Sequence, residues 1–277
     1  MSEQYRLTLK LDSMQPTGSF KVRGAFSDLT KRAPESGVVA ASGGNFGLAV
    51  AYAAGALGHA ATVFVPGSSP EEKVGRIADY GADVRVVPGY YPDALAASRA
   101  WARESGAREI HAYDQRDVVA GQGTCGMEII EQVPDPDSIL VAVGGGGLIG
   151  GIASWARDGA TVVGVESDGC PALHAARDAG GPIDVTVGGM AASALGASRL
   201  GDHAWRANAW IDQSVLVSDQ DIVKAQRWLW ETCRVLAEPA ACAPIAALAS
   251  QAYLPAPGES LVAVISGANT GGLEPLG

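Results

Sequence analysis

The chain has 277 residues, of which 47% are hydrophobic and 18% are charged, as in a folded globular protein. Its formal net charge of −10 disfavours nucleic-acid and anionic-membrane partners, because both are themselves negatively charged. The sequence shows no signal-peptide core and no run of the roughly 18 apolar residues that a membrane span needs. We therefore expect a cytoplasmic protein whose 4 scattered cysteines are reduced and bind no zinc.

Strand-like and helix-like runs alternate along the chain from residue 37 onward. Such alternation indicates βαβ units, and it predicts an α/β fold with two open, mostly parallel sheets flanked by helices. We expect one domain to comprise 1–21 and 114–277, a smaller one to comprise 22–113, and the site to lie in the cleft between them. The expected strands are 37–41, 61–65, 83–87, 109–113, 138–143, 161–166 and 261–265; the expected helices are 45–57, 70–80, 93–105, 121–133, 148–156 and a long stretch from Asp219 past Trp230.

Four consecutive glycines stand between the strand at 138–143 and the helix at 148–156. Glycines let a backbone approach a ligand closely, and the N–H groups at the start of a helix attract anions. A tight turn without a ligand needs fewer glycines, so this run favours a phosphate site. The pattern is neither a dinucleotide fingerprint nor a P-loop. The residues are Gly144, Gly145, Gly146 and Gly147.

A second glycine-rich turn, Ser42-Gly43-Gly44-Asn45, follows the strand at 37–41. Ser42 could simply cap the next helix. The same hydroxyl and the exposed amides would also hold a carboxylate, and the Asn45 amide could donate to a phenolate-like oxygen. Two anion-binding turns predict two ligands, one phosphorylated and one carrying a carboxylate.

Lys21 lies in the segment QPTGSFKVRGAF, residues 15–26. Most loop lysines are solvated, but partial desolvation among Gly, Phe and Val would favour the neutral amine, a nucleophile or base. Ser266 follows the last expected strand, whose carboxyl end would face the same cleft as the glycine turns. A simple strand-end turn explains Ser266 equally well.

Together these segments resemble one family, the fold-type II pyridoxal-phosphate enzymes of the serine/threonine dehydratase (ammonia-lyase) branch. A single motif would be weak evidence, whereas the ordered set is highly specific. The resemblance implies pyridoxal 5'-phosphate as cofactor and a fold like that of the tryptophan synthase β subunit, with a large cofactor-binding domain and a small substrate-gating domain. The motifs, in the family's order, are QPTGSFKVRGAF, SGGNFGLAVAYAA, GQGTCGMEI, VGGGGLIGGIA, GVES, EPAACA and SGAN.

The resemblance also implies a role for each matching residue. Lys21 would carry the cofactor as a Schiff base and then take the proton from the substrate Cα. Asn45 would contact the cofactor's ring hydroxyl, and Ser266 would face its pyridine nitrogen. The phosphate would lie against Gly144, Gly145, Gly146 and Gly147, with Phe20 and Leu148 also at the cofactor, and the substrate carboxylate against Ser42, Gly43, Gly44 and Asn45.

The implied reaction is β-elimination from a small hydroxy-amino acid such as L-threonine or L-serine, giving a 2-keto acid and ammonia. The implied assembly is a homodimer. Two alternatives stay open: β-replacement of the cysteine-synthase kind, whose lysine segment usually reads SxKDR where this chain has SFKVR, and a catalytically impaired subunit that binds cofactor or amino acid.

Four features depart from the family pattern. Only 20 residues precede Lys21, so we expect part of the usual cleft edge or dimer contact to be absent. Phe46 stands where many members have His. Gly43 stands where the serine racemases carry a second serine as base, which disfavours racemisation. Ser193 stands where metal-activated members have Asp, so we expect no bound divalent metal.

Overall fold

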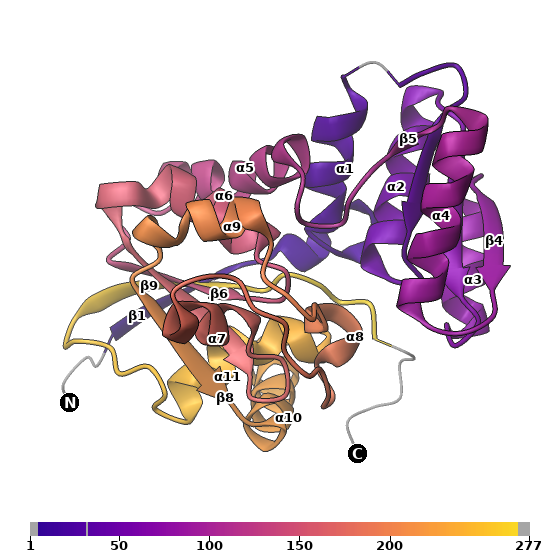
Figure 1. Cartoon of the computed structure of the whole chain (residues 1–277). Coiled ribbons are helices and arrows are strands. Elements are labelled where there is room, and N and C mark those ends of the chain that lie inside the picture. Colours follow the sequence, from indigo (N-terminus) through magenta and orange to yellow (C-terminus); the bar gives the residue numbers. More distant parts are fainter. Residues whose placement is uncertain (1–4, 32, 271–277) are drawn as a thin grey trace. The chain divides into compact units, whose positions relative to one another are not determined.

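The computed structural model describes residues 5–31 and 33–270, and the chain divides into two compact units (Figure 1). Unit 1 consists of residues 1–20 and 122–277, and unit 2 of residues 21–121. Residues 1–4 and 271–277, at the outer ends of the expected large domain, lie outside the described residues. Each unit has its own parallel sheet flanked by helices, which confirms the predicted fold class.

The sheet of unit 1 has five parallel strands in the order β1-β9-β6-β7-β8. The order reverses at β6, because the next strand in the chain, β7, pairs on one side of it and the last, β9, on the other. In open parallel sheets, ligands bind at the carboxyl ends of the strands beside such a reversal. The strands are β1 (Tyr5–Lys10), β6 (Ser138–Ala142), β7 (Thr161–Ser167), β8 (Gln213–Val217) and β9 (Glu259–Val264).

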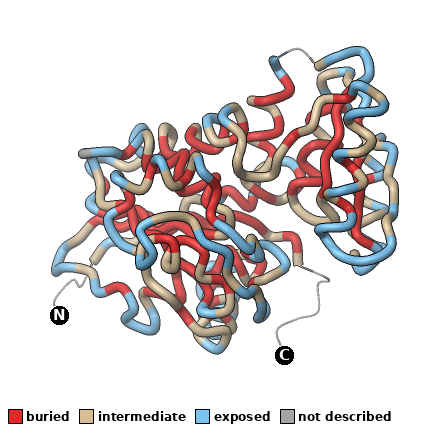
Figure 2. The backbone as a smooth tube through the Cα atoms, in the orientation of Figure 1, coloured by how far each residue is buried: buried red, intermediate tan, exposed pale blue. Residues whose placement is uncertain are grey.

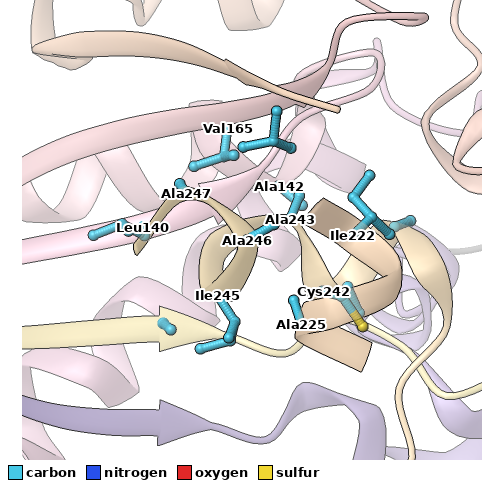
Figure 3. Packing of buried hydrophobic residues seen from close by; sticks show 14 of the residues in the cluster. Leu140, Ala142, Val165, Ile222, Ala225, Cys242, Ala243, Ile245, Ala246 and Ala247 are labelled. Carbon is cyan, nitrogen blue, oxygen red and sulfur yellow. The ribbon is translucent and has the colours of Figure 1, made fainter. Parts of the chain in front are cut away.

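Side chains that alternate along the strands of this sheet enter two hydrophobic clusters, one on each face. Leu140 and Ala142 of β6 belong to the cluster formed with α10 and α11, whereas Ile139 and Val141 belong to the one formed with α5, α6 and α7. Figure 3 shows the small side chains of α11 packed among those of β6, β7 and α10. Alanine lets a helix lie close to a sheet, so the strand ends are rigidly held.

The helices of unit 1 are mostly short, and α5 begins within unit 2 and continues into unit 1. A π-helical turn, Leu229–Cys233, directly continues α10. The helices are α5 (Arg116–Gln132), α6 (Gly147–Ala156), α7 (Ala172–Ala179), α8 (Ala192–Leu195), α9 (Asp202–Arg206), α10 (Asp219–Trp228) and α11 (Ala243–Ala249). The 3-10 turns are Asp12–Met14, Pro16–Gly18, Arg157–Gly159, Asn208–Trp210 and Pro239–Cys242.

The sheet of unit 2 has four parallel strands in the order β4-β3-β2-β5. Val38 and Ala40 of β2 pack with α1 and α2, while Val39 packs with α4. The two central strands, β2 and β3, and most of α2 are buried, as Figure 2 shows in red. The elements are α1 (Lys21–Leu29), β2 (Val38–Ala41), α2 (Asn45–Leu57), β3 (Ala61–Pro66), α3 (Glu71–Asp79), β4 (Asp83–Val87), α4 (Tyr91–Ser105) and β5 (Arg108–Glu109).

One predicted strand, 109–113, is wrong beyond its first residue. β5 is only Arg108–Glu109, and a turn follows it. The physical reason is local: the His111 ring accepts the backbone N–H groups of Tyr113 and Asp114, so these groups cannot donate to a neighbouring strand. The helix expected at 121–133 begins earlier, at Arg116. None of the helices in the described part of the chain is long and apolar enough to cross a membrane.

Candidate active site

Two of the predicted site segments of unit 1 lie at the carboxyl ends of adjacent parallel strands. The glycine turn comes directly after β6 and Ser266 comes shortly after β9, and these strands pair with Leu140 opposite Ala263. Strands that run parallel in this register place their carboxyl-terminal turns at the same edge of the sheet. The structure thus brings Gly144 to Leu148 and Ser266 to one edge, as the sequence predicts for a ligand site.

The glycine turn has the geometry of a phosphate cradle. Gly146 has φ 85°, and a Cβ there would lie 2.4 Å from Cβ of Ala204. A Cβ on Gly144 would lie 2.9 Å from Cα of Leu195. Among the described residues no side chain caps α6, so the first N–H groups of this helix are available to another acceptor. Backbone amides at a helix start, with no side chain in the way, suit an anion such as phosphate.

The segment before Lys21 is fastened to the segment that comes after β9. Phe20 N donates to the carbonyl of Ser266 at 3.0 Å, and Ala268 N donates to the carbonyl of Gly18 at 2.9 Å. The side-chain amide of Asn269 donates to the carbonyl of Thr17 at 2.8 Å. These bonds join the QPTGSF and SGAN motifs, so Phe20, the residue bonded to Lys21, has a fixed position beside Ser266.

Glu238, from the EPAACA motif, packs against the same segment. Its backbone N donates to the carbonyl of Gly267 at 3.0 Å, and a Cβ on Gly267 would lie 2.2 Å from the Glu238 carboxylate. A larger residue at position 267 would require the Glu238 side chain to move. Three motifs far apart in the sequence therefore meet in unit 1.

Two hydroxyl groups in the fastened segment support a ligand site. Those of Thr17 and Ser19 are buried and have no hydrogen-bond partner among the residues that the structure describes. A buried hydroxyl without a partner is costly, so such a group is commonly paired with a ligand or ordered water. Sequence analysis quoted both residues as part of the motif but assigned them no role.

In unit 2, Lys21 begins α1, and its side chain is held between a polar and an aromatic group. Its Nζ donates to the carbonyl of Ala112 at 3.0 Å and lies 5.9 Å from the ring centroid of Phe46. Lys21 is half-buried, and Phe46 is buried. The neighbours of Nζ, Phe46 and Ala112, lie outside the segment 15–26 from which partial desolvation was expected.

The turn Ser42-Gly43-Gly44-Asn45 comes after β2 in unit 2. Ser42 does not cap α2; its hydroxyl instead accepts from Gly44 N at 3.2 Å. A Cβ on Gly43 would lie 2.0 Å from the hydroxyl oxygen of Ser69, so a serine at this position does not fit without a shift. Ser69 was not predicted from the sequence, although the loop after β3 reaches the same sheet edge as the turn after β2 because these two strands run parallel.

The turn after β5 completes the surroundings of Lys21 and was also missed. Burial lowers the pKa of His111 below its usual 6.5, and burial raises the pKa of Tyr113 to about 12. The two rings meet edge to face with centroids 4.6 Å apart. A histidine directly after a short strand is the sequence signal that could have indicated a turn here.

Comparison with known proteins identifies the class of protein. Residues 1–267 match the family described as pyridoxal-phosphate dependent enzyme. The L-threonine ammonia-lyase of Geobacter sulfurreducens is 36% identical over 94% of this chain and 66% of its own length. The biosynthetic L-threonine dehydratase of Haemophilus influenzae is 35% identical over 94% of this chain and 52% of its own length.

Solved structures show the same likeness. Threonine deaminase isoform 2 from Solanum lycopersicum, in its processed form, superposes with a TM-score of 0.91 at 27% identity, over 97% of this chain and 80% of that one. Maize serine racemase superposes with a TM-score of 0.92 at 29% identity, over 98% and 87%.

The chain belongs to the pyridoxal-phosphate dependent enzyme family, and the resemblance drawn from the motifs is confirmed. Pyridoxal 5'-phosphate, the cofactor expected from the sequence, is that of the family. The chain spans about half to two thirds of the length of the two relatives named from Geobacter and Haemophilus.

Proposed function

We propose that this protein is an ammonia-lyase that uses pyridoxal 5'-phosphate to eliminate water and ammonia from a small hydroxy-amino acid such as L-threonine or L-serine. Loss of water leaves an enamine that tautomerises to an imine, and one water then hydrolyses this imine to a 2-keto acid and ammonia. The observation that carries this proposal is the position of the Lys21 amine, partly desolvated between Phe46 and the carbonyl of Ala112. The relatives named as L-threonine ammonia-lyase and dehydratase support the reaction class.

The residues proposed to hold the cofactor are those that match the family motifs, and the glycine turn also has room for a phosphate. The phosphate is assigned to the amides of Gly144, Gly145, Gly146 and Gly147, the ring hydroxyl to Asn45, the pyridine nitrogen to Ser266, and further contacts to Phe20 and Leu148. When bound, the cofactor supplies an electron sink that makes the substrate Cα–H acidic.

Lys21 is the proposed amine for cofactor attachment and the base for the Cα proton. The carbonyl of Ala112 can only accept, so it binds the lysine through an N–H. A neutral amine bound in this way still carries the lone pair that takes the substrate proton. The hydroxyl of Ser42 and the amide of Gly43 are the proposed donors to the substrate carboxylate, while the Gly44 N–H holds the Ser42 hydroxyl in place.

Two features favour elimination over the reactions of other family members. The hydroxyl of Ser266 is neutral, so it would not hold a pyridine nitrogen protonated as a carboxylate would, and a long-lived carbanion is less stabilised. Gly43 leaves no room for a second base beside Ser69, which argues against racemisation. The lysine segment SFKVR argues against β-replacement.

We also propose roles for the two units, an assembly and a cellular compartment. The large unit is proposed to bind the cofactor and the small unit to gate the substrate, with a homodimer as the assembly. The cytoplasm is the proposed compartment, since the four cysteines are scattered without the spacing of a disulfide framework.

The test is product formation by the cofactor-loaded chain. Keto acid and ammonia should appear in equal amounts from L-threonine or L-serine. Lys21→Ala should lower the rate by at least about 10²-fold, because it removes the base. Lys224→Ala, an exposed lysine of α10, is the matched control and should leave the rate unchanged.

Two outcomes would contradict the proposal. One is no keto acid from any hydroxy-amino acid although the cofactor is bound, which would indicate a binding subunit. The other is a substituted amino acid in place of keto acid when sulfide is added, which would indicate β-replacement.

A further inference from the structure

The turn directly after β5 is built around the imidazole of His111. Its Nδ1 accepts the backbone N–H of Asp114 at 2.9 Å and that of Tyr113 at 3.3 Å. The backbone N–H of His111 in turn donates to the side-chain oxygen of Gln115 at 2.8 Å. A nitrogen that accepts two N–H groups carries no proton, so the ring is neutral with its hydrogen on Nε2.

This turn carries the group that holds Lys21. Ala112, whose carbonyl accepts from Lys21 Nζ at 3.0 Å, lies directly between His111 and Tyr113. The peptide plane after Ala112 includes the Tyr113 N–H, so the bond from Nδ1 to that N–H orients the Ala112 carbonyl. The edge-to-face contact of the two rings, at 78°, further restrains the turn.

We propose that His111 is a positioning residue for Lys21: its neutral ring holds the turn whose Ala112 carbonyl fixes the lysine amine, and protonation of the ring releases that amine. The inference rests on the proposed role of Lys21 as the cofactor amine. No substrate contact is assigned to His111, because its effect passes through the backbone.

Burial and the neighbouring charged groups set the pH range in which the His111 ring is neutral. Burial has the largest influence and lowers the pKa of His111; Lys21 and Arg99 act in the same direction, while Asp114 and Glu109 oppose them. The ring is therefore neutral at neutral pH and gains a proton only in acid. A proton on Nδ1 would break the hydrogen bonds from the Tyr113 and Asp114 N–H groups and would place a positive charge near the lysine amine.

Two substitutions separate the two properties of His111, its ability to accept a hydrogen bond and its ability to gain a proton. His111→Asn keeps a side-chain oxygen that can accept the N–H two residues on, as in an Asx-turn, and it cannot be protonated in this pH range. His111→Phe keeps an aromatic ring beside Tyr113 but has no acceptor. The first should preserve the turn and the second should loosen it.

The experiment measures cofactor attachment rather than turnover. The full chain without cofactor is mixed with pyridoxal 5'-phosphate, and the rate of imine formation is followed by visible absorbance from pH 5 to pH 8, with Lys21→Ala subtracted for the other lysines. At neutral pH, His111→Asn should react at nearly the wild-type rate and His111→Phe about tenfold more slowly, as the loss of hydrogen bonds implies. In acid, wild type should lose more rate than His111→Asn.

A second measurement uses the wild type alone. Nitrogen-15 NMR of the ring should show the proton on Nε2 at neutral pH. A proton on Nδ1, a wild-type rate in His111→Phe, or the full acid loss in His111→Asn would each overturn the proposal. Far-UV circular dichroism shows whether each variant folds. If His111→Phe does not fold, the position of the ring proton by NMR and the pH dependence of imine formation in His111→Asn test the proposal. Absent keto acid with normal cofactor attachment would refute the proposed function and leave this test intact.

Discussion

The substitution Gly146→Ala tests the glycine turn by two separate physical effects. Gly146 has φ 85°, a left-handed conformation that costs a residue with a Cβ roughly 1–2 kcal/mol. The new Cβ would also lie 2.4 Å from Cβ of Ala204 and 2.7 Å from the end of Leu200, and overpacking of this kind costs about 1–3 kcal/mol. The sum predicts a loss of about 2–5 kcal/mol in the free energy of unfolding.

Gly258 provides the matched control. It belongs to the same unit and has φ 83°, but no atom of the described residues lies within 4 Å of where its Cβ would be. Gly258→Ala should therefore cost only the left-handed conformation, roughly 1–2 kcal/mol. Any stiffening of the unfolded chain by alanine is common to both variants and cancels in the comparison.

The assay is urea unfolding of the protein without cofactor, followed by the affinity of the folded variants for pyridoxal 5'-phosphate. Gly146→Ala should be less stable than Gly258→Ala, and it alone should bind the cofactor more weakly. Equal stability of the two variants would refute the close packing against Ala204. Unchanged affinity would refute the assignment of the turn to the phosphate.

Three further predictions concern stability. Burial raises the pKa of Glu166 from 4.5 to about 7, so the folded state holds the proton more tightly than the unfolded state does. The free energy of unfolding should therefore fall by on the order of 3 kcal/mol as the pH rises between these values. Glu166→Gln should flatten this pH dependence in urea unfolding, and an unchanged slope would contradict the prediction. Gly43→Ser should lower the free energy of unfolding by about 1–3 kcal/mol, because the new side chain would clash with Ser69. In a double-mutant cycle followed by thermal unfolding, Ser69→Gly should relieve much of this loss, and purely additive losses would show that the two positions are not in contact. Arg108→Leu leaves the buried carboxylate of Asp28 without its partner at 2.5 Å and should lower the free energy of unfolding by about 3 kcal/mol. Adding Asp28→Asn to this variant should recover part of the loss, and an unchanged denaturation midpoint in Arg108→Leu would contradict the pairing.

The parts of the site that could be predicted are those governed by local pattern. The helix at 45–57 is continuous in small apolar residues, and the structure begins and ends it at Asn45 and Leu57. The glycine turn at Gly144 was expected because four glycines come after an apolar strand. Ser266 was placed at the same edge because parallel strands present their carboxyl ends together, and the pairing of β6 with β9 shows this arrangement.

The parts that could not be predicted depend on contacts between distant segments. The carbonyl acceptor of Lys21 comes from Ala112, a residue whose side chain carries no signal. The β1 strand alternates between half-buried and exposed residues at a sheet edge, so its pattern is weak, and it gains its partner from the far end of the chain. The expected strand beyond Glu109 failed because the His111 side chain competes for backbone N–H groups, which a hydrophobic pattern does not register.

The most direct test of the central claim is to find the amine that carries the cofactor. The cofactor-loaded chain is reduced with borohydride, which fixes the imine, and the digested protein is mapped by mass spectrometry. Of the lysines at positions 10, 21, 31, 73 and 224, only Lys21 should carry the pyridoxyl group. A pyridoxyl group on any other lysine, or on none, would contradict the assignment of Lys21 as the reactive amine.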